Sequence, residues 1–228
     1  SIRRQRQMCI RDRIEAPVFG TQLTIELATI SARKQGLSER VDNFFVIDPD
    51  TEIEFDDVVV SFFPTTHTIP DSVGIALETP QGTIVYTGDF RFDPSASKNY
   101  QTDFARLTDL GKRKVIALLS DSAAAESTVE NVSDLVIGEE ITEVFRNAKG
   151  RVIVGTVGSN IARIQQVLQA AHKSNRTIFF PSEDLYEIVD VALKLDKIEI
   201  PSRDVFGQLK QLDRYQDDQI VILATGDV

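Results

Sequence analysis

The chain of 228 residues has few of the side chains that build redox and metal sites: one cysteine, one methionine and two histidines. The single cysteine, Cys9, lies among the first thirteen residues. The rest of the chain can therefore form neither a disulfide nor a thiolate zinc site, which leaves His, Asp and Glu as metal ligands. This composition is compatible with a reducing compartment, and we expect a cytoplasmic location. No apolar run approaches the roughly 18 residues of a membrane-spanning helix, which argues against a membrane role.

Positive charge is also scarce. The chain has 25 basic and 35 acidic residues, and its formal net charge is −10. This balance argues against broad electrostatic capture of nucleic acid, which works through lysines and arginines that neutralise phosphates. A nucleic-acid enzyme of this composition would need bound metal or a local basic stripe instead.

Residues 1–13 differ in composition from everything that follows. The segment SIRRQRQMCIRDR holds five arginines and one aspartate, and it contains the only cysteine and the only methionine. We interpret it as a foreign or disordered basic segment without a chemical role, and we leave it out of the fold prediction.

The first half of the remaining chain predicts a strand and helix followed by a run of strands. Residues 16–20 (APVFG) predict a short buried strand, and residues 21–36 predict an amphipathic helix that ends at Gly36. Five segments rich in β-branched and aromatic residues then predict mostly antiparallel strands. They are NFFVID, TEIEFDD, VVVSFFPTT, VGIALETP and GTIVYTGD.

From residue 103 onwards, helix and strand patterns alternate with short links. The predicted helices are 103–113, 134–150, 159–175 and 184–195, and the predicted strands are 114–121, 151–158, 177–182 and 219–226. This alternation predicts right-handed βαβ units, a mainly parallel sheet covered on both faces and an α/β fold. We place a domain boundary within residues 123–133, which are small and polar.

His67 and Asp89 are candidate metal ligands. His67 follows one predicted strand, and Asp89 ends the second strand of the hairpin that comes next. Because the hairpin strands are antiparallel, both residues fall at its same end, where a carboxylate can bridge two cations and an imidazole can bind one. The alternative is a hydrogen-bonded histidine and a turn that the aspartate closes.

Ser159 and Asn160 are candidate substrate-binding residues. The segment GTVGSN (residues 155–160) follows a predicted strand and opens a predicted helix. The backbone N–H groups around Ser159 and Asn160 would therefore form a phosphate cradle. The alternative is an ordinary βα turn in which Ser159 caps the helix, and both interpretations can hold together.

Four segments together resemble a known family: HTIPDS, TGDFRFD, LLSDS and GTVGSNIARIQQV. Their order and spacing are similar to those of the metallo-β-lactamase fold with a β-CASP insertion, in the form found in ribonuclease J. The resemblance covers most of residues 14–228. It implies part of a metallo-β-lactamase αββα sandwich over residues 14–130 and part of a β-CASP domain over residues 131–228.

The resemblance also implies a function. In this family a dinuclear zinc centre activates water to hydrolyse RNA, with 5′-to-3′ exonuclease and endonuclease activity in RNA processing and decay. It implies RNA as the substrate, two Zn²⁺ or other divalent ions as cofactors, and a homo-oligomer, a dimer or tetramer. By this resemblance His67 is a ligand of one zinc and Asp89 bridges both. Asp121, in LLSDS, matches an acidic residue that supports a catalytic histidine, although a strand-end turn explains it equally well.

The sequence departs from the family pattern in several places. The main ligand cluster, His-x-His-x-Asp-His, would precede Ala16, and later β-CASP histidines would follow Val228. We therefore expect a fragment that is inactive by itself, with His172 as a solvated helix-end residue and no substitute ligand. The chain also has DSAAAE where the family has Asp-Ser-Thr-Asn-Ala-Glu, Ala162 where it has histidine, and PSED (residues 181–184) where it has a Gly-Arg-Ser-Met-like segment.

These departures leave other interpretations open. The chain could belong to another metallo-β-lactamase-fold hydrolase, such as a DNA-processing β-CASP nuclease. It could also be a non-catalytic, RNA-binding paralogue, an interpretation suggested by the alanines at positions 123, 124 and 162. A further alternative is an α/β binding module in which His67 and Asp89 only close a turn.

Overall fold

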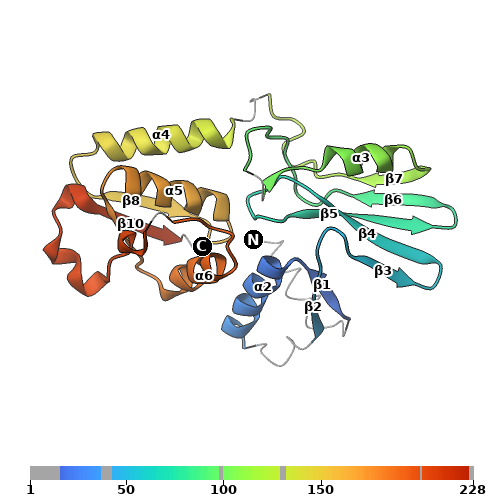
Figure 1. The fold of residues 1–228 in the computed structure, drawn as a ribbon, viewed down its shortest axis with the longest axis horizontal. Helices are drawn as coiled ribbons and strands as arrows, with labels where there is room; N and C mark the ends of the chain where they lie inside the picture. The colour runs from blue at the N-terminus through green and yellow to red at the C-terminus, as the bar shows by residue number, and fades with distance from the viewer. Residues whose placement is uncertain (1–15, 37–42, 98–99, 129–131, 201, 226–228) are drawn as a thin grey trace. The chain divides into compact units, whose positions relative to one another are not determined.

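The computed structural model describes residues 16–36, 43–97, 100–128, 132–200 and 202–225. The predicted foreign segment, residues 1–13, lies outside these residues. The chain divides into two compact units, Ser1–Asp48 and Pro49–Val228, and most of their helices and strands are labelled in Figure 1. None of the helices within the described part of the chain has the length and apolar character needed to cross a membrane.

The first unit is a strand, a helix and a second strand: β1 (Val18–Gly20), α2 (Gln22–Lys34) and β2 (Phe44–Val46). The helix ends where predicted, with Gly36 at a φ of 72° that suits glycine. The strands β1 and β2 are parallel. The prediction that residues 43–48 belong to the antiparallel run was therefore wrong, because a helix between two strands lets them lie side by side in the same direction.

The second unit begins with a five-stranded sheet in the order β3-β4-β5-β6-β7. Its strands are β3 (Glu52–Phe55), β4 (Val58–Pro64), β5 (Val73–Thr79), β6 (Gly82–Tyr86) and β7 (Val115–Leu119). The pairings from β3 to β6 are antiparallel, as predicted, and β7 is parallel to β6. The helix α3 (Phe104–Gly111) covers one face, where its Leu110 packs in a cluster with Phe63, Ala76 and Val85.

The remaining elements confirm the predicted alternation of helix and strand. The helices are α4 (Asp134–Asn147), α5 (Ile161–Lys173) and α6 (Glu183–Lys194), and the sheet is β8 (Val152–Thr156), β10 (Ile220–Thr225) and β9 (Thr177–Phe179), in that order. All its pairings are parallel. Three short 3₁₀ helices, η3 (Arg203–Val205), η4 (Leu209–Arg214) and η5 (Asp217–Gln219), lead into β10. The strand at 115–119, which we had grouped with this region, pairs with β6 instead. The chain has an α/β fold with one parallel and one mixed sheet in its second unit.

Candidate functional site

The segments that follow β4 and β6 pair with each other. Thr66 and Arg91 form an antiparallel bridge, in which the Arg91 N–H donates to the Thr66 carbonyl at 2.9 Å. Thr102 fixes the other side of Thr66: its hydroxyl oxygen accepts the Thr66 N–H at 3.0 Å, and the two hydroxyl oxygens are 2.9 Å apart. Because His67 follows Thr66 and Asp89 lies two residues before Arg91, this bridge brings both to one edge of the sheet.

The structure places the predicted metal ligands next to each other. His67 Nε2 lies 3.9 Å from Asp89 Oδ2, and the two side chains are 30% and 56% exposed. This distance is too long for a hydrogen bond. It is close to the separation of about 3 to 4 Å expected for two donors with bonds near 2 Å to one cation. The geometry suits a shared cation, and the metal-binding role stays a prediction.

Electrostatics favour the neutral form of His67. Partial burial lowers the pKa of His67 below its ordinary value of 6.5, Asp89 and Asp121 act in the opposite direction, and Arg91 lowers it further. Nδ1 lies 3.5 Å from the hydroxyl oxygen of Thr68. A neutral imidazole is the form that can bind a metal ion, so the environment suits a ligand.

Asp121 lies in the turn that follows β7. Its backbone N–H donates to the Thr87 hydroxyl oxygen at 3.1 Å, and its carboxylate accepts the Ala123 N–H at 3.0 Å. These contacts fit the strand-end turn that the sequence left open. The negative charge of Asp121 also acts to raise the pKa of His67. A catalytic role for Asp121 therefore stays a prediction.

The described residues do not complete a metal site. No group of three or more His, Cys, Asp or Glu side chains placed to hold a metal ion occurs among the residues with described positions. A catalytic zinc needs about three protein donors, and His67 and Asp89 supply two. The pair fits the donor chemistry of a divalent cation, and a full site requires further donors. His172, in the last turn of α5, is exposed, as the sequence predicted.

The predicted phosphate cradle lies where β8 leads into α5. Asn160, and not Ser159, is the N-cap, since its side-chain oxygen accepts the Arg163 N–H at 3.0 Å. The N–H groups of Asn160, Ile161 and Ala162 also donate to acceptors within the chain. A phosphate contact here would therefore rest mainly on the Ser159 hydroxyl and the Asn160 amide. Both remain predicted substrate-binding residues.

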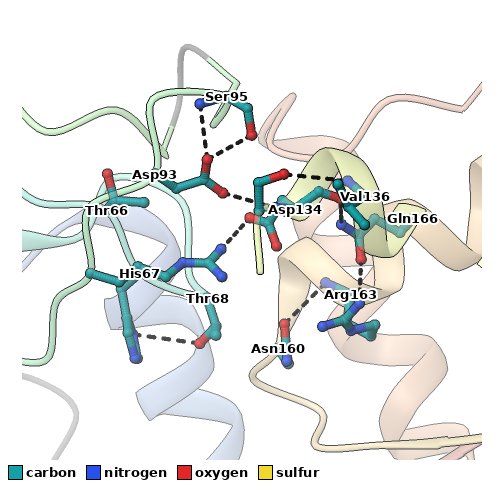
Figure 2. A network of polar contacts seen from close by, with 12 residues as sticks. Thr66, His67, Thr68, Asp93, Ser95, Asp134, Val136, Asn160, Arg163 and Gln166 are labelled. Atoms are coloured by element: carbon teal, nitrogen blue, oxygen red, sulfur yellow. Dashed lines mark hydrogen bonds and ion pairs between the residues drawn. The ribbon is translucent and has the colours of Figure 1, made fainter. Parts of the chain in front are cut away.

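The start of α5 contacts the residue that follows His67. The Ala162 N–H donates to the Thr68 carbonyl at 3.1 Å. Figure 2 shows Asn160 and Arg163 at the start of α5, near His67 and Thr68. The predicted metal ligands and the predicted substrate residues thus lie on neighbouring segments.

Sequence reasoning missed a polar network beside this site. Arg91 forms an ion pair with Asp134, the first residue of α4. The Asp93 carboxylate accepts the Asp134 N–H at 2.8 Å, and its other oxygen accepts the Ser95 N–H at 2.9 Å. The alternating charges of TGDFRFD and the acidic residue after Ser133 at a helix start were the available signals.

The network continues from α4 into α5. Gln166 donates its side-chain N–H to the Asp134 carbonyl at 2.7 Å, and its side-chain oxygen accepts from Arg163 at 2.8 Å. Figure 2 shows this chain of contacts, from Asp93 through Asp134 to Gln166 and Arg163. The residues after β6 are therefore linked to both helices.

Comparisons with known proteins agree with this fold. Residues 149–228 match the family model for the ribonuclease J β-CASP domain. A solved structure of a protein of unknown function from Enterococcus faecalis V583 superposes with a TM-score of 0.67 over 92% of this chain and 52% of that one. Since that protein is 14% identical, the likeness concerns the fold alone. The chain is thus an α/β protein with a β-CASP region.

Closer relatives define the family. The chain is 46% identical over 213 residues to ribonuclease J 2 of Streptococcus pyogenes serotype M3, which is 93% of this chain and 38% of that protein. It is 36% identical over 217 residues to ribonuclease J 2 of Staphylococcus epidermidis, which is 95% of this chain and 39% of that protein. The chain belongs to the ribonuclease J-like β-CASP family. It spans about two fifths of the length of these curated relatives.

Proposed function

We propose that the chain is part of a metal-dependent ribonuclease of the ribonuclease J type, which hydrolyses RNA phosphodiester bonds. One observation carries the proposal: the two predicted metal ligands lie 3.9 Å apart in a chain similar to proteins named ribonuclease J 2. Family membership implies the use of metal in general, and we propose zinc. We also propose 5′-to-3′ exonuclease and endonuclease activity in RNA processing, a cytoplasmic location and a homo-oligomeric assembly.

The residues of this chain would have distinct roles. His67 and Asp89 would hold divalent cations, which supply charge to stabilise the reacting phosphate and lower the pKa of bound water. Asp121, within electrostatic range of His67, would add negative charge at the same edge. Ser159 and Asn160 would contact phosphate through neutral donors, which suits a chain whose net charge is −10.

A second candidate function is a non-catalytic member of the family that binds RNA. The buried Ala162, where the family resemblance predicts histidine, packs with Ala96 and Tyr100. The Tyr100 hydroxyl is buried, and it has no hydrogen-bond partner within the described part of the chain. Ala162 offers no polar group to this cluster, whereas the family pattern has a histidine there, and this favours the non-catalytic candidate.

A chimera tests the proposal. Residues 16–225 would replace the matching segment of the Streptococcus pyogenes ribonuclease J 2, and hydrolysis of 5′-monophosphorylated RNA would be measured. We expect His67→Ala and Asp89→Asn to reduce the rate by about 100-fold or more, beyond the 10- to 100-fold typical of groups that only support a ligand. His172→Ala, which removes an exposed histidine, is the matched control and should leave the rate unchanged.

Each outcome has a meaning. Full activity in both site variants would overturn the metal-ligand roles of His67 and Asp89. A chimera that binds RNA in a gel shift and does not cleave it, beside an active parent enzyme, would support the second candidate. Loss of both binding and cleavage in a folded chimera would contradict both.

A further inference from the structure

We propose that Arg91, Asp93 and Asp134 form a clamp that positions His67 by holding the start of α5 against Thr68. The name clamp refers to these three residues. The proposal rests on the proposed function in one respect: it treats His67 as a functional residue. Asp134 is in this view a positioning residue, which acts through others and does not touch the substrate.

The first step of the argument is that α4 is held at two points. The Arg91 side chain pairs with the Asp134 carboxylate, and the two side chains are 21% and 19% exposed. The Asp93 side chain, in a residue that is 8% exposed, accepts the first N–H of the helix at 2.8 Å. Figure 2 shows Asp93 directed at Asp134. Because these groups are shielded from water, they contribute more than an exposed ion pair would.

The second step is that α4 holds α5. The Gln166 side chain, in a residue that is 9% exposed, donates to the Asp134 carbonyl at 2.7 Å. Four residues earlier on α5, the Ala162 N–H donates to the Thr68 carbonyl at 3.1 Å. The first turns of α5 are thus fixed at two residues: Gln166 contacts α4, and Ala162 contacts the segment that carries His67.

The third step is that these contacts close a ring around His67. Thr66 is bridged to Arg91, Arg91 is paired with Asp134, Asp134 is bonded to Gln166, and Ala162 returns to Thr68. His67 lies between Thr66 and Thr68, so both of its neighbours belong to the ring. Removing the Arg91 and Asp134 ion pair leaves the Asp93 bond to the Asp134 N–H as the only described link between the segment after β6 and the start of α4. The weakened ring should therefore loosen the Ala162 contact and free the backbone around His67.

A simpler role for Asp134 makes a different prediction. An acidic residue in the first turn stabilises its own helix through the helix dipole. Its loss would then weaken the first turn of α4 and leave α5 in place. The two roles differ at one amide, that of Ala162, because its hydrogen bond is made between α5 and the segment after His67.

The test is amide hydrogen exchange of the ¹⁵N-labelled 228-residue chain, with Asp134→Asn as the variant. We expect the Ala162 amide to exchange at least about tenfold faster, which corresponds to about 1.4 kcal/mol of lost protection. The Arg163 amide, bonded within the same helix to Asn160, should keep its rate. Asp134→Glu keeps the charge and should restore protection at Ala162.

Asp217→Asn is the matched control. It removes the aspartate of another arginine pair, Arg151 Nε to Asp217 Oδ1 at 2.7 Å, and should change neither amide. The two histidines of the chain give a second readout, since the His67 ring resonances should shift in Asp134→Asn while those of His172 stay in place. If Asp134→Asn does not fold, Gln166→Met serves as a second variant. It removes the hydrogen bond from Gln166 to the Asp134 carbonyl and should also accelerate exchange of the Ala162 amide.

An unchanged Ala162 amide beside faster exchange at Val136, in the first turn of α4, would overturn the clamp. It would assign Asp134 to its own helix alone. Neither readout uses RNA or a metal ion. A chimera that fails to cleave RNA therefore contradicts the proposed function and leaves the clamp standing. An unchanged exchange rate of the Ala162 amide in Asp134→Asn contradicts the clamp and leaves the proposed function standing.

Discussion

The two sheets of the second unit differ in how completely they are covered. The region of β8, β9 and β10 has a dense core in which α5, α6 and the strands contribute side chains with no exposed surface. These fully buried residues include Ile161, Ile164, Val167, Leu168, Ile178, Phe179, Leu185, Val189, Ile220, Val221 and Leu223. The five-stranded sheet has a small cluster of Phe63, Ala76, Val85 and Leu110, and every residue of its edge strand β7 is exposed.

The predicted metal ligands, His67 and Asp89, thus lie on the less densely packed region. The dense core gains its stability from buried apolar surface. The segments after β4 and β6, in contrast, are placed by directed polar contacts, such as the Thr66 and Thr102 hydroxyls and the pair of Arg91 with Asp134. Functional side chains on segments between strands are commonly positioned in this way by a rigid scaffold.

The comparison is tested most strongly by one substitution made in both sheets. Leu223→Ala, at a residue with no exposed surface, should lower the free energy of unfolding by about 2 to 5 kcal/mol, because it leaves a cavity. Leu118→Ala, at a residue that is 63% exposed, should change it by less than about 0.5 kcal/mol. Urea denaturation followed by circular dichroism gives both values. Equal losses would show that β7 is as well packed as β10.

The buried Arg176 provides the next largest effect. This residue is 4% exposed, and its guanidinium donates to the carbonyls of Phe145, Ala148 and Gly150 at 3.0, 2.6 and 3.0 Å. Arg176→Met should cost about 3 kcal/mol, because it removes this donor from one buried and two partly buried carbonyls at and just after the end of α4. Arg151→Met, at an exposed ion pair, should cost at most about 1 kcal/mol in the same denaturation experiment.

Two glycines sharpen the comparison further. A Cβ on Gly74 would clash with the ring of Phe63, whereas a Cβ on Gly155 of β8 would meet nothing within 4 Å. Gly74→Ala should therefore cost about 1 to 3 kcal/mol through overpacking. Gly155→Ala should be neutral or slightly stabilising, since it restricts the unfolded chain. Thermal unfolding of both variants decides, and a stable Gly74→Ala protein would mean that Phe63 moves aside without cost.

Local patterns predicted the elements of the fold better than their partners. The helix that ends at Gly36, the hairpin of β5 and β6 and the parallel sheet of β8 to β10 all follow from periodicity and turn residues. The sheet membership of β2 and β7 did not follow. A strand pattern fixes which face is buried, and the choice of neighbour depends on residues far away in the chain.

The candidate site was predictable to the extent that topology determines it. His67 and Asp89 meet because a hairpin places its two ends together, and this can be inferred from the order of strands. Arg91 and Asp134 are 43 residues apart in sequence, and no periodicity links them. The alternative that the sequence offered, a cap at Ser159, is off by one residue, because both side chains can cap and helix boundaries shift easily by one residue.

The smallest expected effect concerns Asp93, which joins the segment after β6 to the start of α4. Burial alone would raise the pKa of Asp93, but hydrogen bonds from the Asp134 N–H and from Ser95, with the charge of Arg91, hold it below its ordinary value of 3.8. A carboxyl group with a lowered pKa stabilises the fold above the unfolded-state pKa. That stabilisation is lost as the pH falls through the folded-state pKa.

Asp93→Asn should therefore cost about 1 kcal/mol near pH 7, in the range of a helix-capping residue. The difference from the native chain should shrink as the pH falls below about 4, because the native carboxyl then becomes protonated as well. Urea denaturation at a series of pH values measures this, with Asp217→Asn as the control for an exposed carboxylate. A cost of Asp93→Asn that stays constant down to about pH 2 would mean that the charge of Asp93 contributes nothing, and that shape and neutral hydrogen bonds join α4 to the segment after β6.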